Sequence, residues 1–225
     1  MATLAEQGDW AGVEELQQLA GDPEGLQAFL EDDAGQEQTP VAYEAIHYAA
    51  AAPAKKKYAS THVLLQGEAR KRLLSLAKLI PDYELGNDGR EDDPHVTVKY
   101  GLHTDDPKKV AEVVGGVGAV HGTLTEVNAF YGEETGKDYD VLIVKVSSPE
   151  LHDLNSWIAE RLEHTDTWPD YKPHATIAYL KKGLAKKYVE AFGSLDIPFE
   201  VNHVVFSNAN RVKSLCDLHQ PNYVE

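Results

Sequence analysis

The sequence predicts a protein of mixed helices and strands that is built from two similar halves. Its most informative feature is a seven-residue pattern, Pro-His-x-Thr-(Val/Ile)-x-Tyr, which occurs at residues 94–100 and again at residues 173–179. The apolar runs 62–65 and 141–144 each begin 33 residues before the histidine of their half, and a helical pattern follows each run. Two copies are too few for a solenoid, so we expect one bilobed domain with approximate twofold symmetry.

Each half is predicted to run strand, helix, motif strand, helix, strand. In the first half an apolar stripe over residues 73–80 predicts a helix that Pro81 ends, and Asp106-Pro107 opens a short second helix. The motif itself is predicted to be a strand, because β-branched and aromatic residues follow the histidine.

The second half repeats these signals. Ser148 is predicted to cap a helix that has Pro149 at its first position and an apolar stripe over residues 151–162. A second shared pattern, Lys-Lys-x-x-Glu-x-x-Gly, follows both motifs, at residues 108–115 and 186–193. The duplication therefore extends well beyond the histidine motifs.

A glycine-rich stretch at residues 115–122 resembles a dinucleotide-binding fingerprint. The position of the third required glycine holds His121, and the stretch follows a predicted helix rather than a strand. We interpret it as the end of a helix and a turn.

Composition predicts a soluble globular protein. The chain has 225 residues, of which 42% are hydrophobic and 26% charged, enough to bury a substantial core. No apolar run is long enough to cross a bilayer, and the N-terminus lacks a basic start and an apolar segment, so we expect neither secretion nor a membrane partner. The single cysteine, Cys216, fits a reducing cytoplasm and is interpreted as an ordinary thiol.

The first 57 residues differ from the rest. They hold eleven acidic residues against three lysines, a net charge near −8 out of −16 for the whole chain. We expect residues 1–57 to be an acidic, helical or partly disordered extension that docks on the main domain or on a partner protein. Residues 58–225 are expected to form the main domain, with lobes at about 58–131 and 137–211 and a C-terminal tail at 212–225.

The net charge also restricts the substrate. Proteins that grip long nucleic acids present large basic surfaces, whereas this chain has a sequence pI near 5.0. A long duplex is therefore excluded as a partner. A small nucleotide needs only a local positive pocket, for which the lysines near the motifs are candidates: Lys99, Lys172, Lys181 and Lys182.

The two motifs predict acid–base chemistry. Because side chains alternate along a strand, His95 and Thr97 point to one side, as do His174 and Thr176. One imidazole can take a proton from an attacking hydroxyl while the other gives a proton to the departing oxygen, which is what phosphodiester cleavage needs. The threonine hydroxyls can hold the phosphate oxygens. The sequence leaves open which histidine is the acid and which the base.

The alternation of side chains along a strand also predicts which face each residue near the motifs occupies. It places Lys99 on the face of His95 as a candidate phosphate contact, and it places Tyr100 and Tyr179 on the opposite face, where packing is expected. Tyr58 and Trp168 are candidates for stacking on a base. The remaining histidines lack zinc-ligand spacing, so no metal site and no cofactor are expected.

The two motifs resemble the paired His-x-Thr signature of the 2H phosphoesterase superfamily, the LigT-like and cyclic-phosphodiesterase group. The resemblance covers roughly Tyr58 to Arg211. It implies an α+β fold in which two antiparallel sheets line a central cleft with helices outside, and metal-independent cleavage of cyclic or 2′,5′-type phosphodiesters. It also implies that His95 and His174 are the catalytic pair and that Thr97 and Thr176 hold the phosphate. Residues 94–102 are similar to phage members, among them anti-CBASS nucleases that destroy cyclic oligonucleotide signals.

We therefore expect a cytoplasmic hydrolase that cleaves a small cyclic nucleotide or cyclic oligonucleotide, in the host cytoplasm if a phage encodes it. Two alternatives stay open. One is a 2′,3′-cyclic phosphodiesterase that acts on RNA ends. The other is a protein that only sequesters a nucleotide while its acidic extension recruits a partner.

Overall fold

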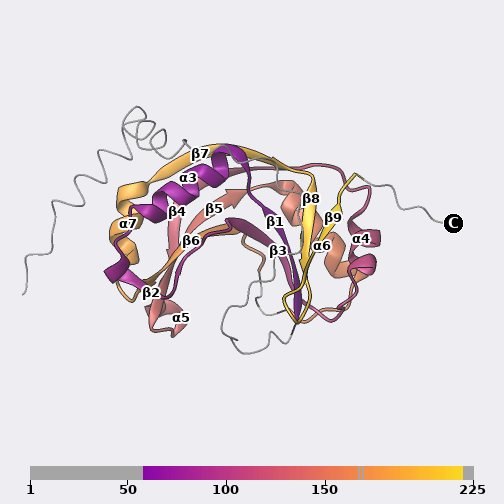
Figure 1. Ribbon diagram of the computed structural model, residues 1–225, viewed down its shortest axis with the longest axis horizontal. Helices are drawn as coiled ribbons and strands as arrows, with labels where there is room; N and C mark the ends of the chain where they lie inside the picture. The colour runs from indigo at the N-terminus through magenta and orange to yellow at the C-terminus, as the bar shows by residue number, and fades with distance from the viewer. Residues whose placement is uncertain (1–57, 167, 169, 220–225) are drawn as a thin grey trace, which may run out of the picture.

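The computed structural model describes residues 58–166, 168 and 170–219, and Figure 1 shows their arrangement. The acidic extension expected at residues 1–57 lies outside these described residues. Within the described part of the chain, no helix has the length and apolar character to cross a membrane.

The five elements predicted for each half occur in the predicted order, and the structure adds further elements between and after them. The elements of the first half are β1 (Ala59–Leu64), α3 (Gly67–Lys78), the 3-10 helix η1 (Asp82–Glu84), β2 (Leu85–Arg90), β3 (His95–Leu102), α4 (Pro107–Val114) and β4 (Val120–Phe130). Those of the second half are α5 (Gly132–Thr135), β5 (Tyr139–Ser147), α6 (Pro149–Arg161), β6 (His174–Lys181), α7 (Ala185–Phe192), β7 (Ser194–Val201), β8 (His203–Ser207) and β9 (Lys213–Asp217). Strand β9 lies within the segment expected to be a tail.

The predicted helix boundaries have the expected caps. The Ser148 hydroxyl accepts a hydrogen bond from the Leu151 N–H at 3.1 Å, with Pro149 at the first position of α6. Asp106 caps α4 in the same way, accepting from the Lys108 N–H at 2.9 Å. The glycine-rich stretch 115–122 spans the end of α4, a turn and the start of β4, so its interpretation as a helix end and turn is confirmed.

The described strands form one antiparallel sheet in the order β7-β4-β5-β6-β3-β1-β8-β9, with β2 also paired to β6. The sheet is strongly curled, and helices lie on one side of it (Figure 1). The predicted α+β class is confirmed. The two antiparallel sheets that were expected are joined into one, because β3 and β6 pair through Val96 and Ala175.

The two halves of the sheet exchange a strand. Strand β4, from the first half of the chain, pairs with β5 and β7. Strand β8, from the second half, pairs with β1. The spatial halves therefore do not coincide with the contiguous segments 58–131 and 137–211.

The duplication holds at the level of single residues. In the first half, Leu64 lies opposite His95 and His62 opposite Thr97 in the β1–β3 pair. In the second half, the β5–β6 pair repeats this register, as Lys145 lies opposite His174 and Ile143 opposite Thr176. Each residue of β1 thus has an equivalent in β5.

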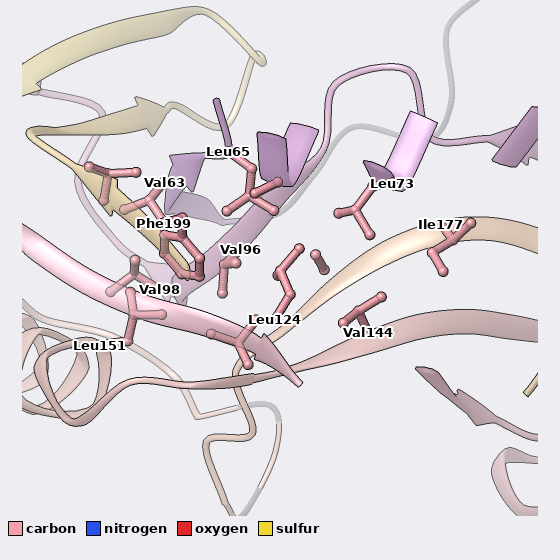
Figure 2. Close-up of a cluster of buried hydrophobic side chains, with 14 of the residues drawn as sticks. Val63, Leu65, Leu73, Val96, Val98, Leu124, Val144, Leu151, Ile177 and Phe199 are labelled. Carbon is pink, nitrogen blue, oxygen red and sulfur yellow. The ribbon is translucent and has the colours of Figure 1, made fainter. Parts of the chain in front are cut away.

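The core lies between the sheet and its helices. Helices α3 and α7 pack on the half that contains β4, β5, β6 and β7, and α4 packs on β8 and β9, whereas α6 packs on both β3 and β4 and so spans the two halves. Figure 2 shows side chains from both halves in one cluster: Val63, Val96, Val98, Val144 and Ile177 from strands, with Leu73 and Leu151 from helices. The core thus supports the strands that carry both motifs.

Candidate active site

The two His-x-Thr motifs meet at their middle residues. Val96 and Ala175 lie opposite each other and are fully buried on the core side of the sheet. Alternation therefore places His95, Thr97, His174 and Thr176, all partly exposed, on the other side, which we call the histidine face. Because the strands are antiparallel, the position of His95 adjoins that of Thr176, and the position of Thr97 adjoins that of His174.

Both imidazoles are oriented by the same backbone contact. The Nδ1 atom of His95 lies 2.8 Å from the carbonyl oxygen of Asp93, and the Nδ1 atom of His174 lies 2.7 Å from that of Lys172. A carbonyl oxygen can only accept, so Nδ1 carries the proton in each ring. The Nε2 atom of each neutral imidazole is then left to accept a proton.

The prolines of the motifs hold the segments that make these contacts. The Pro94 carbonyl accepts a hydrogen bond from the Leu65 N–H at 3.0 Å, and the Pro173 carbonyl accepts one from the Val146 N–H at 3.1 Å. Each proline thus fixes the entry to its strand from the end of the neighbouring strand. The backbone carbonyl two residues before each histidine is positioned as a result.

The surroundings of the two histidines differ. His174 packs against the ring of Phe130, edge to face, with centroids 4.9 Å apart. Burial lowers the pKa of His174, the hydrogen bond to the Lys172 carbonyl opposes this, and the nearby charge of His95 lowers the pKa further. His174 is therefore the histidine that tends to stay neutral.

His95 instead packs against a third histidine. The rings of His62 and His95 have centroids 4.9 Å apart at an angle of 56°, and His62 is buried. In the second half the equivalent of His62 is Ile143, so this imidazole has no counterpart beside His174.

The threonines present free hydroxyls. Within the described residues, neither the Thr97 hydroxyl nor the Thr176 hydroxyl takes part in a hydrogen bond. Both can therefore donate to a bound anion without first losing a partner in the protein.

A β-bulge in each motif strand changes the predicted faces. The register between β1 and β3 shifts so that Thr61 lies opposite Lys99 while His62 lies opposite Thr97, which leaves Val98 as an extra residue. Lys99 therefore turns to the core side, where its side chain is 9% exposed and its Nζ lies 2.7 Å from Asp166. The expectation that Lys99 shares the face of His95 is wrong, because strict alternation fails at the bulge.

The second motif has the same bulge. The β5–β6 register shifts between Leu142 and Ile143, so that Ile177 and Ala178 are both buried and Tyr179 lies opposite Val141. Tyr100 and Tyr179 consequently lie on the histidine face. The expectation that they lie on the opposite face is wrong for the same reason as for Lys99.

These tyrosines form matching aromatic pairs. Tyr100 packs on Tyr58 with ring centroids 6.2 Å apart, and Tyr179 packs on Tyr139 with centroids 5.9 Å apart. Tyr58 and Tyr139 occupy equivalent positions at the start of the two halves. Tyr58 also stacks on His103, at 5.4 Å.

Trp168 is exposed, at 69%. It lies between Asp166, which contacts Lys99, and Tyr171, whose hydroxyl donates to the Thr97 carbonyl at 2.9 Å. The structure thus places Asp166 and Tyr171, which precede and follow Trp168 in the sequence, beside β3.

The residues of the histidine face that were not predicted include His62, Phe130 and Lys145. Lys145 lies opposite His174, is half exposed, and pairs with Glu126 at 2.6 Å. The 33-residue spacing of the apolar runs singles out His62 but pairs it with Val141, whereas the strand register makes Ile143 its equivalent. Phe130 has no such signal, since its place depends on the pairing of β4 with β5.

Within the described residues, no group of three or more His, Cys, Asp or Glu side chains is arranged to hold a metal ion. Cys216 is buried, with its sulfur 4.0 Å from the Pro107 carbonyl, and burial raises its pKa to about 11. This environment keeps the thiol protonated, in agreement with its interpretation as an ordinary thiol.

Comparison with known proteins gives a family match that includes both motifs. The sequence model of the 2′-5′ RNA ligase superfamily matches residues 83–213, more than half of the chain. No protein with a curated description matches the sequence.

Solved structures are similar to this chain at low sequence identity, and TT0787 of Thermus thermophilus shows the same fold. That protein is 13% identical with a TM-score of 0.51, over 72% of this chain and 98% of that one. Usb1 of Kluyveromyces marxianus is 11% identical with a TM-score of 0.47, over 74% and 100% of the two chains. The PDE domain of MHV ns2 is 15% identical with a TM-score of 0.42, over 70% and 98%.

Proposed function

The chain belongs to the 2′-5′ RNA ligase superfamily, also called the 2H phosphoesterases, and on this basis we propose that it cleaves a small cyclic nucleotide or cyclic oligonucleotide without a metal ion. The observation that carries the proposal is the meeting of the two His-x-Thr motifs across Val96 and Ala175. It brings two imidazoles of fixed tautomer and two free hydroxyls to one face of the sheet.

Proton transfers between the substrate and each of the two histidines account for the chemistry. In the proposed first step, a ribose hydroxyl beside the phosphate attacks phosphorus and gives its proton to Nε2 of one histidine. The bond from phosphorus to the leaving oxygen breaks, and that oxygen takes a proton from Nε2 of the other histidine. Thr97 and Thr176 donate hydrogen bonds to the non-bridging oxygens, where negative charge grows. The nucleophile comes from the substrate or from water, so the protein need not supply one.

The surroundings of the histidines support a division of roles. A general base must be neutral when the substrate binds, and the lowered pKa of His174 favours that form. We assign His174 as the base of the first step and His95 as the acid. The roles are exchanged when water hydrolyses a cyclic phosphate, because each histidine then holds the proton state that the first step left.

Charge supports a small substrate. The chain has a net charge of −16, which disfavours long nucleic acids. Lys145, opposite His174 on the histidine face, offers a local positive charge. Its exposed ion pair with Glu126 is weak, so a phosphate can compete for the ammonium group. A cyclic oligonucleotide substrate would fit the counter-defence role expected from the sequence.

The test is incubation with cyclic dinucleotides, cyclic trinucleotides and RNA ending in 2′,3′-cyclic phosphate, each with and without a chelator. We expect turnover of a cyclic substrate that survives chelation and falls by about 10²- to 10⁴-fold in His95→Ala and in His174→Ala. His121→Ala is the matched control, because this exposed histidine of β4 contacts Glu150 and Glu200 rather than the motifs.

The same panel separates the alternatives. Turnover confined to the RNA ends would favour the 2′,3′-cyclic phosphodiesterase. Tight binding of a nucleotide that stays intact would contradict an enzyme and favour sequestration. Full activity in either single histidine variant would contradict the acid–base assignment even if a phosphodiester were cleaved.

A further inference from the structure

The two halves of the histidine face differ around their shared motifs. The equivalent residues can be compared in rows across the strands, because the β1–β3 and β5–β6 registers match. In the row of the motif tyrosines, Tyr100, Ser60 and Ser207 follow one another in the first half. The equivalent row of the second half is Tyr179, Val141 and Phe130.

In the row of the motif threonines, the first half is again more polar than the second beside the threonine. Thr97 has His62 opposite it, whereas Thr176 has Ile143. The next residues along this row are apolar in the first half, Val205, and polar in the second, Asn128. The residues opposite the histidines also have this reversed polarity, with Leu64 in the first half and Lys145 in the second. The contrast is therefore limited to the row of the motif tyrosines, the residues opposite the motif threonines and the rings that contact the two histidines.

The rings that contact the two histidines also differ, being polar in the first half and apolar in the second. His95 touches the imidazole of His62, whereas His174 touches the benzyl ring of Phe130. Phe130 and Tyr179 are partly exposed, above Val141 and Ile143, which are buried. In this patch of Phe130, Tyr179, Val141 and Ile143 the ring of Phe130 contacts His174, whereas the equivalent position of the first half holds Ser207, although Tyr100 matches Tyr179 there.

We propose that the histidine face binds its substrate in one orientation, with a nucleobase on the patch of Phe130, Tyr179, Val141 and Ile143. A base is flat and apolar on its faces, so it stacks on aromatic side chains whatever its identity. Ser60, Ser207 and His62 are buried but make the strands beneath the other half polar rather than apolar, which suits a sugar or phosphate. The inference rests on the proposed function, since it orients a substrate between the same two histidines.

The first experiment compares a substrate with and without a base. The probes are adenosine 2′,3′-cyclic monophosphate and the 2,3-cyclic phosphate of methyl riboside. We expect Phe130→Ala to lower kcat/KM for the adenosine compound by about 10- to 100-fold and to change that for the base-free compound by much less. Phe130→Leu keeps apolar volume but loses the ring, so it should show the same selective loss without the packing defect that Phe130→Ala can cause. Trp157→Ala, on the helix side of the sheet, is the control for loss of an exposed aromatic residue.

The second experiment needs no turnover. Methyl NMR signals of Ile143, Val141 and Val205 are followed while either probe is added to the His95→Ala variant. A base on the proposed patch shifts Ile143 and Val141 by its ring current and leaves Val205, on the polar half, almost unchanged. Equal shifts in both halves, shifts at Val205 alone, or no shift at saturation would overturn the inference.

The two experiments separate the inference from the proposed function. If neither probe is cleaved while the adenosine compound still shifts Ile143 and Val141, the base site stands and the activity on these probes does not. If both probes are cleaved and Phe130→Ala affects them equally, the activity stands and the base site is refuted.

Discussion

Val96 and Ala175, the middle residues of the two His-x-Thr motifs, form the pair through which β3 joins β6. Both side chains are fully buried on the core side. A displacement at this pair therefore moves the two motifs relative to each other.

Ala175→Leu is expected to reduce activity beyond its effect on stability. The larger side chain overpacks the junction and lowers the free energy of unfolding by about 1–3 kcal/mol. It also pushes β3 from β6, so kcat falls even where the variant is fully folded. Chemical denaturation and steady-state kinetics measure the two effects. Ala77→Leu, equally buried in α3, is the control and should lose stability while keeping kcat.

The pKa of His174 is expected to lie below its ordinary value of 6.5, because burial against Phe130 disfavours the charged ring. An NMR titration of the imidazole signals measures it. Phe130→Ala exposes the ring and should raise the pKa toward 6.5, and His95→Ala should raise it by removing a nearby charge. A titration midpoint above 6.5 in the unmodified protein would contradict the description of this site.

The free energy of unfolding should depend on pH because of the lowered pKa of His174. The unfolded chain binds a proton at His174 near pH 6.5, whereas the folded protein binds it only at lower pH. The stability that comes from a neutral His174 is therefore fully present above pH 6.5. It decreases as the pH falls from 6.5 to the lowered pKa of the folded protein. Comparison of denaturation curves for the unmodified protein and His174→Gln isolates it: the variant should lose less stability over this range.

The sequence was sufficient to predict the duplication, the order of five elements in each half, and the two His-x-Thr pairs, because each rests on local patterns. It was not sufficient to place Lys99, Tyr100 and Tyr179. Their faces depend on a bulge at Val98 and another at Ile177, and a bulge is a property of the pairing of two strands. The exchange of β4 and β8 between the halves is equally non-local, so Phe130 could not be assigned to the site of His174.

The bulge at Val98 gives a direct contrast between two lysines. Lys99→Met should leave kcat/KM nearly unchanged, because its ammonium group pairs with Asp166 on the core side. The loss of stability should stay within about 1 kcal/mol, since Asp166 is exposed and remains solvated. Lys145→Met should raise KM, because Lys145 lies opposite His174 on the histidine face. The reverse result, with only Lys99→Met impaired in binding, would contradict the register of β3.

Gly101 is expected to be the glycine of β3 that tolerates no side chain. Its φ of +96° disfavours other residues, and an added Cβ would collide with the Thr165 carbonyl, in the segment that leads to Asp166. Gly89 of β2 has a φ of +67° with open space around it, so Gly89→Ala should cost only the conformational strain, about 1–2 kcal/mol. Gly101→Ala should lower the free energy of unfolding by about 1–3 kcal/mol more, because the collision forces the backbone apart. Equal losses in chemical denaturation would mean that residues 163–165 do not pack against β3 in solution.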